Sequence, residues 1–126
     1  MSQQKNELVL SFKNSADLSA KQYYFVGISA DQSVNVSGAS AKPVGVLIEP
    51  NKSGYTNVPV GVCVLGTAKI VVKKNADEAL PAAGDYIVSA SDGKGMKLKS
   101  ETVDLNRGIA LESASAEGDI IEILLV

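Results

Sequence analysis

Residues 58–65 read VPVGVCVL, and this stretch decides the class of fold. Its valines favour a β-strand, and a glycine stands in its middle. The stretches PVGVL at 43–47 and RGIAL at 107–111 repeat the pattern. Glycine weakens the interior of a strand unless another backbone passes close by or the chain bends there. The three stretches therefore predict a tightly curved, barrel-like sheet, and their irregular spacing indicates recurrent strand geometry rather than a solenoid repeat.

Strands are expected along most of the chain, because apolar and β-branched runs alternate with turn residues. The expected strands are 7–13, 22–28, 31–36, 44–48, 58–65, 69–72, 86–90, 96–99, 107–112 and 119–126. Gly66-Thr67 is expected to be a turn and Asp92-Gly93 the tip of a hairpin, since glycine accepts a positive φ. Residues 76–83 fit one short helical turn. The predicted fold is all-β with at most one short helix, as a small β-barrel-like or β-sandwich domain.

Composition limits the partners that we expect. The chain has 126 residues, enough for one domain with a real core, and its formal net charge is −2. Without a long basic run there is no electrostatic footprint for nucleic acid. Segment 1–6 lacks the apolar stretch of a secretory signal, and no run reaches the roughly 20 apolar residues that span a bilayer. We therefore expect no membrane partner and synthesis in a cytoplasm, with the single Cys63 acting as a buried small hydrophobe.

The sequence does not predict an enzyme. It contains no His, which removes the usual general base near neutral pH and the commonest transition-metal ligand. Catalysis by carboxylates alone would fall to Asp77 and Glu78, to Glu117 and Asp119, or to Glu122, but the first three lie in expected turns and Glu122 fits strand alternation. Phosphate-binding glycine loops and calcium loops are also absent from the sequence. We expect no catalytic residues, no cofactor and no bound metal.

Two other classes of binding module stay open. Gly95-Met96-Lys97-Leu98 looks like the Met-Lys signature of biotinyl or lipoyl carrier domains, which would make Lys97 a carrier lysine. The Glu-Ala that normally precedes this signature is replaced by Lys94-Gly95, so an exposed strand lysine is the favoured interpretation. A cell-surface or carbohydrate-binding β-module is the leading alternative, although only Tyr23, Tyr24 and Tyr55 could form its aromatic platform.

The closing segment carries a resemblance. Residues 107–125 read RGIALESASAEGDIIEILL, a Gly-hydrophobic-Ala strand, a small-residue turn, Gly-Asp and a terminal apolar strand. Together with PVGV at 43–46, AAGD at 82–85 and DGK at 92–94, this order resembles a family of bacteriophage capsid decoration, or cement, proteins. The resemblance implies a non-enzymatic structural virion protein, made in the host cytoplasm, that binds the major capsid protein. It further implies a homotrimer on the outer capsid surface that stabilises the capsid.

The two ends of the chain are expected to differ in role. Residues 1–13 are predicted to form an N-terminal arm and first strand, and 14–126 a single β-rich decoration domain. An arm that adds to an edge strand of a capsid subunit would make contact through Gln3, Gln4, Lys5, Glu7 and Val9. The alternative for this segment is an ordinary first strand behind a frayed tail. The terminal strand 119–126 is either buried on both sides or partly exposed and in need of a partner chain.

Overall fold

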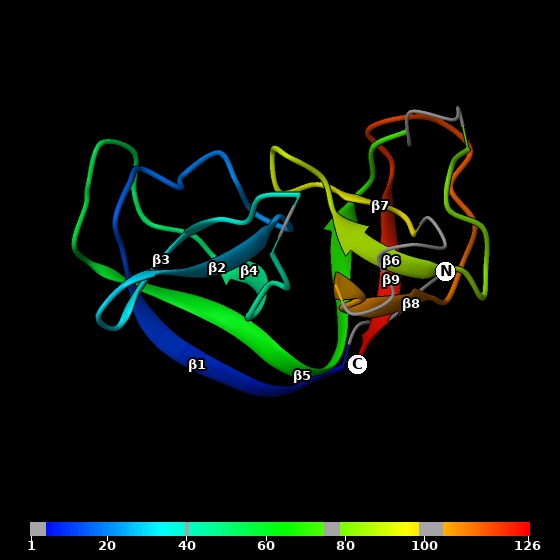
Figure 1. Cartoon of the computed structure of the whole chain (residues 1–126). Helices are drawn as coiled ribbons and strands as arrows, with labels where there is room; N and C mark the ends of the chain where they lie inside the picture. Colours follow the sequence, from blue (N-terminus) through cyan, green and yellow to red (C-terminus); the bar gives the residue numbers. More distant parts are fainter. Residues whose placement is uncertain (1–4, 40, 75–78, 99–104) are drawn as a thin grey trace.

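The computed structural model describes residues 5–39, 41–74, 79–98 and 105–126, and these ranges form nine strands without an α-helix. The strands are β1 (Asn6–Asn14), β2 (Phe25–Ala30), β3 (Ser33–Val36), β4 (Gly45–Glu49), β5 (Pro59–Val71), β6 (Tyr86–Ser89), β7 (Gly95–Lys97), β8 (Gly108–Ala110) and β9 (Ile120–Leu125) (Figure 1). The predicted all-β class is confirmed. Within the described ranges, no helix has the length and apolar character that crossing a membrane requires.

The first five strands close into a barrel. β1 pairs in parallel with β3. The next pairs are all antiparallel: β3 with β2, β2 with β4, and β4 with β5. The ring closes where β5 pairs antiparallel with β1. The barrel is filled by aliphatic side chains, namely Leu18, Val26, Val34, Leu47, Val60 and Val62, with Phe12 packed against them. Removing these side chains from water is the main force that closes the ring.

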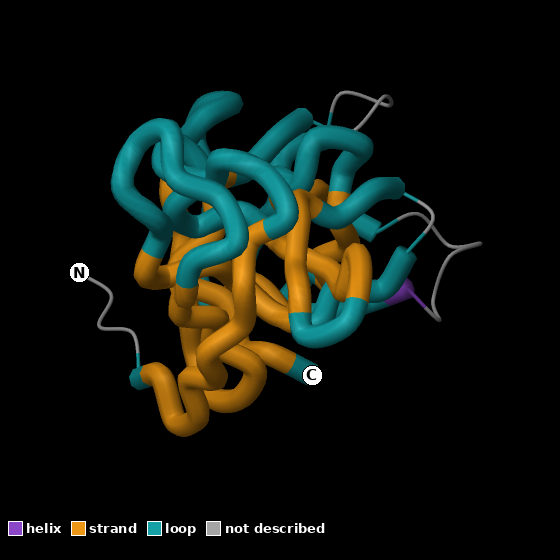
Figure 2. The backbone as a smooth tube through the Cα atoms, turned by 90° about the vertical axis from the view of Figure 1, so that its left-hand side faces the viewer, coloured by secondary structure: helices purple, strands orange, loops and turns teal. Residues whose placement is uncertain are grey.

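A second group of strands begins where β5 leaves the first barrel. The C-terminal half of β5 pairs with β9, and the sheet continues through β8 and β6 to β7. A parallel bridge between Val72 and Gly95 brings β7 back beside the end of β5. Figures 1 and 2 show β1 and the middle of β5 along the lower edge of the molecule, with most loops at the top.

The two groups of strands share one core. Phe25, Val46 and Cys63 lie side by side across β2, β4 and β5, and they are fully buried. They cluster with residues of the second sheet that include Ala68 and Ile70. These three side chains thus point outward from the first barrel and pack against the second sheet. The expectation of a buried Cys63 is confirmed, and burial raises the pKa of its thiol.

One predicted turn is wrong. The expected strands 58–65 and 69–72 are a single strand, β5, which runs through Gly66 and Thr67. Gly66 has a φ of +98° and pairs with Asn6 of β1, whereas Thr67 already pairs with Leu124 of β9. Because neighbouring strands hold the chain on each side of this glycine, its positive φ bends the strand instead of ending it. The bend carries β5 from the first barrel into the second sheet.

Two further expectations need correction. The predicted strand 22–28 starts only at Phe25, because Tyr23 adopts a positive φ of 69°. Hydrogen bonds fix this conformation, since the Tyr23 amide donates to the Leu47 carbonyl and the Tyr23 carbonyl accepts from the Val71 amide. The predicted helical turn at 76–83 is absent from its described part, 79–83, and residues 76–78 lie outside the described ranges.

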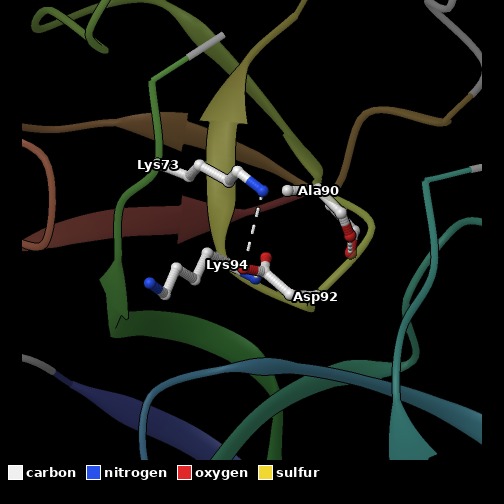
Figure 3. A network of polar contacts seen from close by, with 5 residues as sticks. Lys73, Ala90, Asp92 and Lys94 are labelled. Atoms are coloured by element: carbon white, nitrogen blue, oxygen red, sulfur yellow. Dashed lines mark hydrogen bonds and ion pairs between the residues drawn. The ribbon is translucent and has the colours of Figure 1, made fainter.

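The predicted hairpin at Asp92-Gly93 is confirmed. β6 and β7 pair antiparallel on either side of it, and Gly93 has a φ of +88°. Figure 3 shows Lys73 reaching this turn, where its Nζ lies 3.6 Å from Asp92 Oδ2. The same carboxylate accepts a hydrogen bond from the Lys94 amide, and the Ala90 amide donates to the Lys94 carbonyl. The hairpin tip is therefore tied to the end of β5.

Candidate interaction surface

The N-terminal strand presents apolar side chains on both of its faces. Every residue from Asn6 to Ser11 is exposed, because β3 pairs only with the last two residues of β1. Leu8, Val9 and Leu10 are 43%, 38% and 40% exposed. A strand with three consecutive exposed aliphatic residues is characteristic of a surface that binds another chain.

On one side, β1 has no neighbouring strand before Lys13 among the described residues. The Asn14 amide donates toward β5, to the Val58 carbonyl at 3.2 Å, whereas the Lys13 amide donates to Gln32 on the opposite side. Backbone groups alternate in direction along a strand, so the amides and carbonyls of Val9 and Ser11 point to the same side as those of Lys13. Among the described residues no strand pairs there between Asn6 and Phe12. We call residues 9–11 on this side the open edge of β1.

A shallow groove of about 240 Å³ runs from β1 across β5 to β4. It is lined by Val9, Leu10, Ser11, Glu49, Pro50, Pro59, Val60 and Gly61. Gly61 leaves room for the Glu49 side chain, with which a Cβ at this position would collide. Apart from the Glu49 carboxylate, the lining side chains carry no charge. The groove therefore adjoins the exposed aliphatic residues of β1 and contains one negative group, the Glu49 carboxylate.

A second apolar row crosses the outer face of the second sheet. Direct strand pairing places Tyr86 beside Ile109, Ile109 beside Leu124, and Leu124 beside Thr67. Tyr86 is 49% and Leu124 39% exposed. β9 thus buries its inner face and leaves its outer face partly open. The partial exposure expected in one of the two alternatives for the terminal strand is confirmed, and its need for a partner chain stays a prediction.

The predicted contact residues fall into two groups. Glu7 and Val9 lie on β1, while Lys5 precedes it and both donates a backbone hydrogen bond to Thr67 Oγ1 and accepts one from the Thr67 amide. Gln3 and Gln4 lie outside the described residues. Leu8 and Leu10 are also exposed, but they are missing from the predicted contact residues. The signal that could have revealed their exposure is the unbroken apolar triplet LVL, which cannot alternate between core and solvent.

A polar network anchors the C-terminal end of β1 to the loop before β5. The buried Asn14 accepts from the Val58 amide through Oδ1 and donates through Nδ2 to the Tyr55 carbonyl, both at 2.8 Å. Asn51 donates to the same Tyr55 carbonyl at 3.0 Å, and to Asp17 Oδ1 at 2.9 Å. These bonds satisfy buried amide groups that would otherwise destabilise the fold. They hold the C-terminal end of β1 in place, whereas within the described ranges its N-terminal half pairs only with β5.

Two of the residues considered for other chemistry, Asp119 and Lys97, make contacts within the fold. Asp119 accepts hydrogen bonds from Ser115 and Ala116 in the turn before β9, and bonds from Ser115 lower the pKa of its carboxyl. Lys97 lies within the β6–β7 ladder opposite Ile87, with its Nζ 3.8 Å from Asp85. Asp77 and Glu78 lie outside the described residues. Within the described ranges, no three His, Cys, Asp or Glu side chains gather as metal ligands would.

The chain was compared with family models, curated proteins and solved structures. No family model and no curated protein matches the sequence. The crystal structure of the head fiber gp8.5 N base of bacteriophage phi29 has a similar fold, with a TM-score of 0.68 and 15% sequence identity. The match covers 94% of this chain and 93% of that chain. At this identity the likeness shows a common fold that includes both groups of strands.

Proposed function

We propose that this chain is a non-enzymatic structural protein of a phage virion, which binds the outer surface of the capsid and stabilises it. The observation that carries the proposal is the likeness in fold, over 94% of the chain, to the base of a phage head fiber. The order of motifs in residues 107–125, which resembles capsid decoration proteins, supports the same assignment independently.

The proposed partner is the major capsid protein, and the proposed contact is the N-terminal region. Leu8, Val9 and Leu10 project from the barrel with a groove beside them, so a capsid subunit could cover apolar surface that the fold leaves in water. Lys5 and Glu7 flank this patch, and Gln3 and Gln4 precede it in the chain. Burying apolar area of this kind is the main source of affinity in specific interfaces.

The capsid would be stabilised because many copies of the chain bind to it. In the proposed arrangement three copies gather as a trimer on the shell and cover joints between capsid subunits. Roughly 800 Å² per partner is enough for a specific contact, and three linked contacts add avidity. The added interface area opposes separation of the subunits when the packaged genome presses outward. No chemical step is involved.

Co-sedimentation with phage heads that lack the protein tests this proposal. The purified chain is expected to pellet with its cognate heads in a saturable manner and to raise the temperature at which those heads rupture. Heads of an unrelated phage serve as the control and should leave the protein in the supernatant. A chain that stays in the supernatant with every head preparation, or that leaves the rupture temperature unchanged on binding, would contradict the proposal.

A further inference from the structure

We propose that the groove beside β1 receives one basic side chain, of lysine or arginine, from an extended segment that pairs with the open edge of β1. The Glu49 carboxylate is the group that recognises this side chain. The inference deepens the proposed function, on which the identity of the segment as part of a capsid subunit rests. It is carried by the register of three strands, by the direction of the Glu49 side chain, and by the charge of the groove.

Three residues lie side by side on the outer face of the first barrel. Glu49 of β4 pairs with Gly61 of β5, and Gly61 pairs with Ser11 of β1. Directly paired residues point to the same face of a sheet, and this face is the outer one because Val60 and Val62 point into the barrel core. Gly61 has no side chain and Ser11 has a small one. The row therefore forms a trough that ends at the open edge of β1.

The Glu49 side chain lies in this trough. It fills the space that a Cβ on Gly61 would need, so its carboxylate stands over β5, one strand closer to β1 than its own backbone. A segment added to the open edge would have its backbone two strand spacings, each about 4.8 Å, from β5. Lysine and arginine are the cationic residues with the longest side chains. From the position opposite Ser11, they are the ones that can extend along the trough to this carboxylate.

The Glu49 carboxylate has no partner among the residues that the structure describes. It takes part in neither of the described ion pairs and in none of the described side-chain hydrogen bonds. Lys13 lies two residues beyond Ser11 on β1, opposite Pro59, and it forms no described ion pair with Glu49. A cation from another chain would therefore meet this carboxylate without displacing an existing pair. Such complementarity gives specificity to a contact between proteins.

The size and the lining of the groove suit one long side chain. Its volume of about 240 Å³ lies below the roughly 300–1,000 Å³ of pockets that bind drug-sized molecules. Val9 and Leu10 line it on β1, and Pro50 and Pro59 line it next to β4 and β5. Lysine and arginine bury their aliphatic stems along apolar surface of this kind, while the charged end reaches a polar group. The apolar lining thus favours a basic side chain over a free cation.

The neighbouring strand restricts the segment to a short stretch. β3 pairs with β1 at Lys13, so an added strand has only the open edge, residues 9–11, to pair with. A basic residue opposite Ser11 places the residue two positions away opposite Val9, on the same face, whichever way the segment runs. Val9 is 38% exposed and would pack against an apolar residue there. The expected pattern is a basic and a β-branched apolar residue separated by one residue.

A peptide titration followed by NMR tests the site without a capsid. The probe is the capped pentapeptide Thr-Val-Lys-Val-Thr, and Thr-Val-Glu-Val-Thr is its matched control. The lysine peptide is expected to shift the amide resonances of Ser11 and Gly61 and to bind at least about ten-fold more tightly than the glutamate peptide, because its charge is opposite to that of Glu49. Glu49→Gln should remove this preference. No binding, equal binding of both peptides, or shifts confined to other parts of the chain would overturn the inference.

Head binding shows whether the same site serves the capsid. Glu49→Gln should raise the dissociation constant for heads that lack the protein about ten-fold and should weaken its dependence on salt, since one screened ion pair is lost. Glu117→Gln removes an exposed carboxylate before β9 and is the matched control, expected to bind as the wild type does. Unchanged head binding by Glu49→Gln would overturn the inference. A wild type that binds the lysine peptide but no heads would refute the capsid proposal and leave the basic-residue site standing.

Discussion

Arg107 connects the two groups of strands through backbone carbonyls. Its guanidinium donates to Pro43 and Val44 before β4, to Val64 in β5, and to Val126 after β9, at distances of 2.8 to 3.1 Å. The side chain is buried, and burial lowers the pKa of the guanidinium. Arginine suits this position because its planar fork offers five donors in fixed directions, and it stays charged at any physiological pH.

Arg107→Met is expected to lower the free energy of unfolding by about 3 kcal/mol, because it leaves several carbonyls without a donor in a buried site. Arg107→Lys should recover only part of this loss, since an ammonium group cannot reach carbonyls on several sides. Urea unfolding followed by circular dichroism measures both values. Two variants as stable as the wild type would show that the carbonyls find other partners.

Asp17 organises the loop that anchors β1. The Asn51 side chain, with the backbone amides of Ser19 and Gly54, donates hydrogen bonds to its carboxylate and holds the pKa of Asp17 well below its usual range. A carboxyl whose pKa is lower in the folded state contributes stability above its unfolded pKa of about 3.9. That contribution is lost as the pH falls through the folded pKa.

The stability of the wild type should therefore fall as the pH drops below about 5, and Asp17→Asn should flatten this dependence. The dependence should not vanish, because the pKa of Asp119 is lowered in the same sense by its bonds from Ser115. Urea unfolding at intervals from pH 7 to pH 2.5 provides the comparison. Parallel curves for the wild type and Asp17→Asn would contradict the assigned hydrogen bonds.

For single residues, the sequence predicted the roles that depend on neighbouring residues in the chain. It did not predict the roles that depend on contacts with distant segments. A lone Cys63 within an apolar run had to be buried, and Gly93 after Asp92 had to allow a positive φ. Arg107, in contrast, carries no local signal, because its four acceptors come from segments far apart in the chain. The hydrogen bond that Asn51 donates to Asp17 is equally impossible to predict from the local sequence, because it forms only when the two loops are brought together.

Among the elements, β4 depends on a close approach to β5 at its first residue. A Cβ on Gly45 would collide with the carbonyl oxygen of Cys63, a backbone atom that cannot move aside without breaking the ladder. Gly45→Ala should therefore lower the free energy of unfolding by about 2 kcal/mol. Gly38 is the matched control, since an added Cβ there meets nothing within 4 Å. Equal thermal melting of the two variants would refute the close-packing role of Gly45.

The N-terminal segment can be tested as an element. Deleting residues 2–7 should weaken head binding while leaving the fold intact, because it removes four of the predicted contact residues and spares the barrel core. The deletion removes the pairing of Asn6 with Gly66 and the bonds of Lys5 to Thr67. Co-sedimentation with heads and thermal melting measure the two properties. A truncated chain that binds heads as tightly as the wild type would exclude this segment from the interface.

Strand positions followed from the sequence more reliably than strand ends. Alternation located the nine strands, whereas Gly66 was taken for a turn and the start of β2 was placed too early. Both errors have a tertiary cause. Gly66 bends within β5 because β1 and β9 hold it on either side, and Tyr23 takes a positive φ because Leu47 and Val71 bond its backbone. Such partners cannot be identified from a local pattern.

For the whole molecule, the curvature of the sheet could be predicted from the sequence, but the arrangement of the strands could not. The recurring glycines indicated a barrel-like sheet, and Gly45 and Gly61 do stand where side chains or backbone pass close. The division into a closed barrel and a second sheet that share one long strand had no counterpart in the sequence pattern. It depends on which strands pair across the chain, and in particular on the return of β5 to β1.

The proposed binding to a capsid gives a role to the surfaces that the two groups of strands leave exposed. The exposed half of β1, with its groove, is the surface proposed for the capsid subunit. The row across Tyr86 and Leu124 is a second apolar surface that a neighbouring copy on the shell could cover. These roles can be separated only on an assembled head.

Electron cryomicroscopy of heads that lack the protein, imaged before and after the purified chain is added, tests the central claim most directly. We expect added density on the outer surface at three-fold or quasi-three-fold positions, with β1 facing the capsid subunits. Identical maps before and after addition, or density confined to the interior of the shell, would contradict it.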